Sequence, residues 1–98
     1  MVIEIAQFTA QPGKAEELRA GLLRGLTVIR RWEACVAAEA RRRVEDANVF
    51  NYQIVWRSLE DHQAFRASPL FAEYRSHING LFVEPVAVYH YETLAEGD

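Results

Sequence analysis

The sequence has few of the residues that build covalently cross-linked or metal-stabilised folds. It contains one cysteine, Cys35, so no intrachain disulfide and no multi-cysteine zinc site can form. Because Cys35 stands at the start of a predicted strand, we interpret it as a buried structural thiol rather than a nucleophile. The 98 residues leave no room for a second core, and nothing marks a repeat or a linker. We therefore predict a single domain that spans residues 1–98.

The sequence also lacks a strong charge of one sign and any long apolar run. Its formal net charge is −3, which gives no general attraction to nucleic acid or to acidic membranes. The arginines at 41–43 are a local exception, but alternation along a strand would place them on both faces, so we interpret them as solvated. No apolar run approaches a membrane span, and residues 1–4 lack the basic start of a signal peptide. The sequence thus predicts a cytoplasmic protein that binds neither nucleic acid nor membranes.

The first third of the chain shows a strand pattern followed by a helix pattern. Residues 2–9 alternate, which predicts a strand. After the break at residues 11–13, the two glutamates at 16–17 favour the start of a helix. We expect the arginines at 30–31 to occupy its last turn, where positive charge is favoured. The apolar stripe of this helix comprises Leu18, Leu22, Gly25, Leu26, Ile29 and Trp32.

Two further strands follow and are expected to pair as a hairpin. Residues 35–44 alternate small apolar with polar side chains, and residues 49–56 alternate aromatic or β-branched side chains with others. The two apolar faces coincide only if the connecting loop has an odd number of residues. We predict a three-residue loop, residues 46–48, with Asn48 in the left-handed conformation. The faces that should coincide carry Val36, Ala38 and Ala40 on one strand and Tyr52, Ile54 and Trp56 on the other.

Two helix-start signals come after the third strand. Ser58 with Asp61 resembles a capping box, and Ser68 before proline is a second cap signal. The helical region is therefore split in two, and Asn79 before glycine stops it. A final strand is predicted at residues 86–92. One side of the second helical segment carries Phe71, Tyr74, Ile78 and Leu81.

The order of predicted elements is strand, helix, strand, strand, split helix, strand. This βαββαβ order defines an α+β, ferredoxin-like fold, in which helices cover one face of a four-stranded antiparallel sheet. The opposite face keeps apolar side chains, such as Ile3, Ile5 and Val55, that need a cover. A second copy of the sheet is the simplest cover, so we expect a homodimer through the sheet face.

Two other activities of this fold class do not fit the sequence. An RNA-binding version needs an aromatic stacking motif with basic and glycine neighbours, and residues 50–52 lack both. A metal-carrying version needs paired cysteines after the first strand, so we expect no metal site.

Five short motifs, in order along nearly the whole chain, resemble a known family. Together they resemble the antibiotic biosynthesis monooxygenase family of dimeric α+β barrels. The resemblance implies oxidation of a small aromatic phenol, quinol or polyketide-type substrate by dioxygen, with no cofactor. The motifs are Pro12-Gly13-Lys14 with Glu16-Glu17-Leu18, Glu45-Asp46 through Asn48, Trp56-Arg57-Ser58, Ser68-Pro69-Leu70-Phe71, and Tyr89-His90-Tyr91.

The resemblance separates two activities within this family. Haem-degrading members resemble one another in a Trp, a His and an Asn, and these positions fall on Phe65, Arg75 and Ala6 here. We therefore do not expect haem breakdown. Members that oxidise polyketide phenols resemble one another in an Asn and a Trp four residues apart, with a later Arg. Trp56 and Arg75 match this pattern, whereas Tyr52 stands at the Asn position and could donate a hydrogen bond in its place.

Oxygenation without a cofactor requires a substrate anion that itself reduces dioxygen. The site then needs an apolar wall, a base, and a cationic group beside the developing anion. We assign the catalytic roles to Trp56, to Arg75 as the anion clamp and to His62 as the base, with His77 as the other candidate base. The residues assigned to substrate binding are Phe8, Tyr52, Phe65, Tyr74 and His77.

Each assignment has a structural alternative. Trp56 can be a core anchor whose indole N–H is bonded, and His62, in the first turn of a helix, can be exposed to solvent. Arg75 can pair with Glu73 or with a carboxylate of a partner subunit. His90 on an edge strand fits a dimer contact better than a catalyst.

The alternative function is a non-catalytic, dimeric small-molecule-binding protein with the same fold. Both functions require a vacant space of roughly a few hundred Å³ that holds an ionisable group beside the aromatic wall. A core plugged by side chains excludes both.

Overall fold

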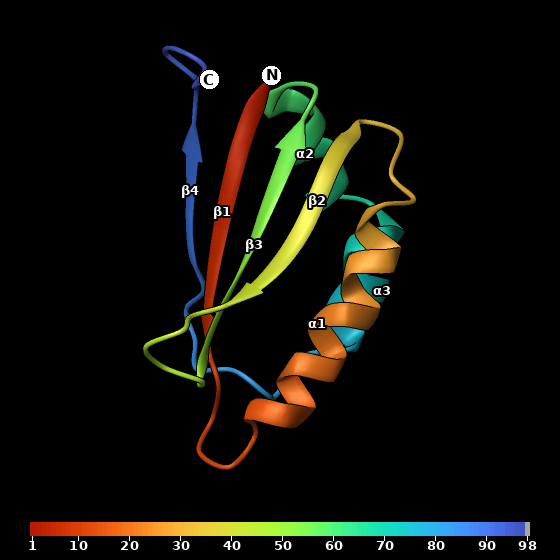
Figure 1. Cartoon of the computed structure of the whole chain (residues 1–98). Helices are drawn as coiled ribbons and strands as arrows, with labels where there is room; N and C mark the ends of the chain where they lie inside the picture. The colour runs from red at the N-terminus through yellow and green to blue at the C-terminus, as the bar shows by residue number, and fades with distance from the viewer. Residues whose placement is uncertain (98) are drawn as a thin grey trace.

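Three helices cover one face of a four-stranded antiparallel sheet (Figure 1), which is the predicted ferredoxin-like α+β fold. The computed structural model describes residues 1–97. The strand order is β2-β3-β1-β4, so the first strand is central and the last lies at an edge. Among the described residues, no helix has the length and hydropathy needed to cross a membrane. The elements are β1 (Val2–Thr9), α1 (Ala15–Ile29), β2 (Cys35–Arg42), β3 (Val49–Trp56), α2 (Leu59–Arg66), α3 (Pro69–Ser76) and β4 (Ala87–Tyr91).

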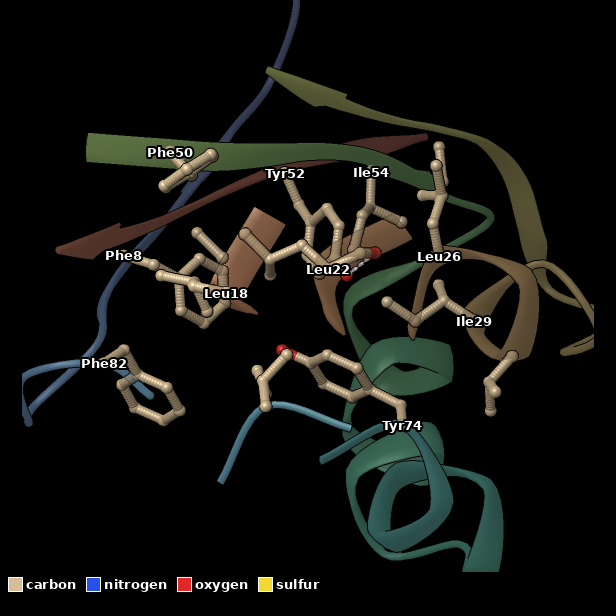
Figure 2. Packing of buried hydrophobic residues seen from close by; sticks show 14 of the residues in the cluster. Phe8, Leu18, Leu22, Leu26, Ile29, Phe50, Tyr52, Ile54, Tyr74 and Phe82 are labelled. Carbon is tan, nitrogen blue, oxygen red and sulfur yellow. Dashed lines mark hydrogen bonds between the residues drawn. The ribbon is translucent and has the colours of Figure 1, made fainter. Parts of the chain in front are cut away.

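Helix α1 contains more buried residues than α2 or α3. The part of the predicted stripe that lies in the helix is buried, whereas Trp32 lies beyond its end and is half-buried. Figure 2 shows Tyr52 and Ile54 of β3 pointing to the side where the leucines of α1 lie. The helix ends at Ile29, so the prediction that residues 30–31 form its last turn is wrong. Arg30 caps the end and its guanidinium donates to the Ala38 carbonyl at 2.6 Å, which draws it toward β2.

Helix α2 begins almost directly after β3, as the cap signal predicts. The backbone N–H of Asp61 donates to Ser58 Oγ at 3.1 Å, and this hydroxyl donates to the Asp61 carboxylate at 2.8 Å. Arg57 binds the same carboxylate at 2.9 Å, so the cap is held from two sides. With only Arg57 and Ser58 between strand and helix, the inner side of α2 lies over the end of the sheet.

The β2–β3 pairing confirms in part the prediction that the apolar faces of the two strands coincide. Ala38 pairs with Ile54 and Ala40 pairs with Tyr52, so these residues share the helix-covered face. The prediction fails for Val36, because the register shifts between Cys35 and Ala37. Val36 lies in this irregularity and is 55 % exposed.

The loop between β2 and β3 differs from the predicted three-residue turn. The connection comprises residues 43–48. Asp46 closes it: its side chain accepts from the Asn48 N–H at 3.0 Å, and its carbonyl accepts from the Val49 N–H at 3.1 Å. Among residues 1–97 only glycines have positive φ, so Asn48 is not left-handed. The aspartate side chain makes a left-handed residue unnecessary, because it supplies the turn's hydrogen bonds itself.

The edge strand β4 divides its side chains between the two faces of the sheet. Glu4 pairs with His90 and Ile5 pairs with Tyr89, and directly opposite residues of antiparallel strands point to the same face. His90 therefore lies on the helix side with Glu4. Tyr89, which is 64 % exposed, lies on the open side with Ile5.

Two glycines of α1 allow the close approach of α3. A Cβ on Gly21 would lie 2.3 Å from the backbone oxygen of His77, and one on Gly25 would lie 2.8 Å from the Tyr74 ring. The first clash is with backbone, which cannot rotate away as a side chain can. Gly21 is therefore required by packing, although glycine is unfavourable in a helix interior.

We expect Gly21→Ala to destabilise the fold by roughly 2 kcal/mol, although the same change at an open helix site stabilises. Urea unfolding monitored by circular dichroism measures the unfolding free energy of each protein. Thr27→Ala, on the exposed side of α1, is the control and should change the unfolding free energy by no more than about 0.5 kcal/mol. A Gly21→Ala protein as stable as the control would contradict the packing account.

Candidate functional site

A cleft of about 290 Å³ opens between the sheet and the helices. Aromatic side chains form most of its wall, and Glu4, Arg66 and Arg75 add charged groups. Its size and lining meet the requirement shared by both predicted functions. Seven of the eight predicted site residues line it: Phe8, Tyr52, Trp56, His62, Phe65, Tyr74 and Arg75.

Trp56 is both a core residue and part of the cleft wall. Its side chain is fully buried, and its indole N–H donates to Glu4 Oε1 at 2.8 Å. Its ring stacks on the His62 ring at 4.7 Å with 14° between the planes, and it also packs against Phe65. The indole therefore fixes the positions of the carboxylate and the imidazole together.

His62 is buried, which corrects the expectation that its first-turn position would expose it. Only 4 % of it is exposed, because α2 starts so close to β3 that this side of the helix faces the sheet. Its Nε2 lies 3.1 Å from Glu4 Oε1, and its Nδ1 lies 2.7 Å from His90 Nε2. The three residues form a continuous row, which we call the Glu4–His62–His90 chain.

The surroundings of His62 keep its ring neutral at neutral pH. Burial, and to a smaller extent the nearby charges of His90 and Arg66, lower its pKa from 6.5 to about 4. A neutral imidazole offers one N–H donor and one acceptor nitrogen. His62 can therefore accept a proton on one side while it releases one on the other.

Glu4 is a carboxyl group buried on the helix-covered face of β1. Burial raises its pKa, whereas the hydrogen bond from Trp56 and the positive charges of Arg66 and Arg75 lower it. Burial dominates, so Glu4 is a stronger base than an exposed carboxylate. A base of this kind operates closer to neutral pH.

Arg75 lies among aromatic rings and has no carboxylate partner among residues 1–97. The alternative pairing with Glu73 is not found, because Glu73 binds Arg31 at 2.6 Å. The buried Nε of Arg75 has no hydrogen-bond partner in the described chain. This nitrogen is thus available to an anion in the cleft. The guanidinium lies over the rings of Phe71, Phe82 and Tyr74, at 5.1, 5.4 and 5.7 Å.

The tyrosines contribute rings rather than acidic hydroxyls. The Tyr52 hydroxyl donates to the Leu22 carbonyl (Figure 2), so it is not available to replace a substrate-binding amide. Burial raises the pKa of Tyr52 and of Tyr74, which keeps both protonated. Tyr52 lines the cleft, but its hydroxyl bonds to the protein.

The structure leaves one predicted residue outside the cleft and adds others. His77 caps the end of α3 and does not line the cleft. Glu4 and Arg66 line it, and His90 contacts His62, although sequence reasoning assigned none of them to the site. One signal for Glu4 was present: alternation along β1 puts this carboxylate on the same face as Ala6.

Glu4, His62 and His90 are also the residues that could hold a metal ion. One ligand atom from each lies within 4.8 Å of the others. Cys35 lies elsewhere and is half-buried, and burial raises its pKa, which makes its thiol less reactive.

The fold and the cleft define a small α+β protein of the ferredoxin-like class with an aromatic, partly charged pocket. The family model for antibiotic biosynthesis monooxygenase matches residues 1–76, and the chain belongs to this family. This confirms the resemblance inferred from the sequence motifs. A search of curated protein sequences gives no match.

Solved structures agree with this assignment. A protein of Bordetella bronchiseptica, described as a candidate antibiotic biosynthesis monooxygenase, is 26 % identical with a TM-score of 0.87, over 96 % of this chain and 97 % of its own. Rv0793 of Mycobacterium tuberculosis is 27 % identical with a TM-score of 0.82, over 99 % of this chain and 98 % of its own. SnoaB of Streptomyces nogalater, named a cofactor-independent oxygenase, shares the fold at 17 % identity and a TM-score of 0.83, over 97 % of this chain and 94 % of its own.

The lowered pKa of His62 predicts a loss of stability in acid. The unfolded chain binds a proton at this residue near pH 6.5 and the folded protein only near pH 4, so protonation favours unfolding as the pH falls between them. Relative to His62→Gln, the wild type should lose roughly 2–3 kcal/mol of unfolding free energy across that interval. Urea unfolding at several pH values measures this difference. Parallel pH profiles for the two proteins would show that His62 is not buried in its neutral form.

Proposed function

We propose that this protein is a monooxygenase that oxidises a small aromatic phenol, quinol or polyketide-type compound with dioxygen and without a cofactor. The observation that supports this most directly is the juxtaposition, in one aromatic cleft, of the Arg75 guanidinium, which has no carboxylate partner among residues 1–97, and a buried basic pair, Glu4 with His62. Family membership and the similar fold of SnoaB, named a cofactor-independent oxygenase, support the same reaction class.

The reaction begins with removal of the phenolic proton. The O–H bond breaks, the proton goes to the basic pair, and the electron pair stays on oxygen, where Arg75 stabilises the negative charge. The aromatic wall, which includes Trp56 and Phe65, excludes water and leaves the ring carbons open to dioxygen. Dioxygen then takes the electrons from the anion.

The overall reaction balances without an external reductant. A phenol with a free ring C–H and one dioxygen give a quinone and one water: one oxygen atom forms the new carbonyl and the other leaves as water. The two hydrogens in that water come from the phenolic O–H and the ring C–H. The protein therefore needs to supply only binding, proton transfer and charge stabilisation.

We expect Arg75→Ala to lower kcat/KM by about 10- to 100-fold, because a hydrogen bond to a charged group contributes roughly 1.5–3 kcal/mol. Trp56→Phe keeps an aromatic ring but removes the N–H that holds Glu4, and we expect a loss of about tenfold. Oxygen uptake by the metal-free protein with a panel of phenols, reduced quinols and anthrones measures both effects.

Arg31→Ala is the matched control, because Arg31 is an exposed arginine that binds Glu73 outside the cleft. It should retain wild-type oxygen uptake. If no compound in the panel gives protein-dependent uptake, the oxygenase proposal fails. Saturable binding of the same compounds, lost in Arg75→Ala, would then support the alternative function, a non-catalytic small-molecule-binding protein.

We also propose that two copies pair through the open face of the sheet. This face carries Ile3, Ile5 and Val55 beside two tyrosines of β4, Tyr89 and Tyr91, which are 64 % and 53 % exposed. An apolar sheet face of this kind usually has a cover. A cytoplasmic location and a single domain over residues 1–98 remain predictions.

Ile5→Lys should convert the dimer to a monomer, because it would bury two charges in the centre of the interface. Sedimentation equilibrium gives the mass of each protein. Leu23→Lys, on the exposed side of α1, is the control and should leave the mass unchanged. A wild-type protein that sediments as a monomer at micromolar concentration would rule out this interface.

A further inference from the structure

The Glu4–His62–His90 chain is assembled from three separate elements. Glu4 on β1 and His90 on β4 are directly opposite each other in the antiparallel register. Helix α2 places His62 against both, and Trp56 of β3 holds the carboxylate and stacks on the His62 ring. Strand pairing and stacking therefore fix all three side chains before any ligand binds.

His62 contacts its two neighbours through opposite ring nitrogens. Nε2 lies 3.1 Å from Glu4 Oε1, and Nδ1 lies 2.7 Å from His90 Nε2. A metal ion bound to His62 would need one nitrogen to face the ligand atoms of both neighbours. The observed arrangement is a row, and a row of this kind suits proton transfer from one group to the next better than chelation.

The chain runs from the cleft to solvent. Glu4 and His62 are only 6 % and 4 % exposed, whereas His90 lies on the exposed edge strand β4. Glu4 Oε1 accepts from Trp56, while Oε2 has no hydrogen-bond partner among residues 1–97. Because both nitrogens of His62 are occupied by protein contacts, Glu4 is the member best placed to take a proton from a ligand in the cleft.

We propose that Glu4 is the group that removes the substrate proton, and that His62 and His90 carry this proton to solvent. This inference rests on the proposed oxygenase function and reassigns the role of base from His62 to Glu4. His62 and His90 act through Glu4, so they are relay groups. Arg66 and Arg75, the charged groups facing the chain from α2 and α3, favour the ionised carboxylate that accepts the proton.

Each step conserves protons and electron pairs. The substrate O–H bond breaks and its proton binds a Glu4 carboxylate oxygen. The Glu4 carboxyl group turns so that its protonated oxygen faces His62 and passes this proton to Nε2 of His62, which releases the proton on its Nδ1 to His90 Nε2. His90 then releases the proton on its own Nδ1 to water. When dioxygen has been reduced, the reverse sequence returns a proton inward to form the product water and restores the starting tautomers.

Glu4→Gln tests the base. Glutamine keeps the shape and an oxygen that can accept from Trp56, but it does not accept a proton, so we expect kcat to fall by at least about 100-fold. His90→Ala tests the exit of the proton. We expect a loss of about tenfold in kcat at low buffer concentration, with KM unchanged, and recovery when imidazole is added to the solution.

Gln63→Ala is the control, because Gln63 follows His62 on α2 but its side chain is exposed to solvent and does not line the cleft. It should show neither loss nor response to imidazole. If the wild type turns over a substrate and His90→Ala is equally fast at every buffer concentration, the relay is wrong and the oxygenase function stands. If Glu4→Gln retains wild-type kcat, the assignment of the base is wrong.

A measurement without substrate separates failure of the relay from failure of the function. In ¹⁵N NMR spectra of the histidine rings, a proton shared between His62 Nδ1 and His90 Nε2 should shift both resonances, and His90→Ala should abolish the shift at His62. This result supports the chain even if the wild type oxidises nothing in the panel. If the His62 ring resonances are the same in the wild type and in His90→Ala, the proposed chain is wrong. A stoichiometric metal in the purified protein that is lost in Glu4→Gln and in His90→Ala also overturns it.

Discussion

The buried carboxylate of Glu4 is the constraint on which the rest of the site depends. A carboxylate removed from water costs several kcal/mol unless hydrogen bonds or opposite charges compensate. Here Trp56 donates to it, His62 lies 3.1 Å away, and two arginines face the same cleft. An apolar core cannot close over such a group, so the space between sheet and helices stays open at this end.

The position of His62 follows from local sequence signals near the end of β3. Ser58 caps α2 two residues after Trp56, and this short connection leaves the helix no freedom to turn its first residues away from the sheet. The imidazole consequently stacks on the indole that holds Glu4. The Ser58 cap thus positions His62, and the stacking of His62 on Trp56 keeps the imidazole beside Glu4. The basic pair, Glu4 with His62, is therefore positioned before a ligand enters.

The sequence predicted what local patterns determine and missed what tertiary register determines. Strand alternation and cap signals predicted β1, β3 and the split helix, and alternation along β3 together with helical spacing predicted the aromatic wall. Glu4, His62 and His90 meet only because β4 pairs with β1 in one register and α2 lies over both. The hydrophobic periodicity of the sequence does not predict that these three side chains lie in contact. The hairpin loop was missed for a different reason, since the Asp46 side chain supplied hydrogen bonds that a backbone turn usually provides.

The location of the polar groups also limits how a substrate can lie in the cleft. At the position where the resemblance places an amide, Tyr52 has a hydroxyl bonded to the protein, so the middle of β3 offers only an aromatic surface. Proton-accepting and anion-binding groups come from other elements: Glu4 from β1 and Arg75 from α3. A phenolic oxygen must lie where both can reach it, with the rest of its ring against Tyr52 and Phe65. The residues of this chain therefore favour a substrate whose ionisable oxygen lies at one end of a flat apolar ring system, because a second polar group at the other end would meet only aromatic side chains.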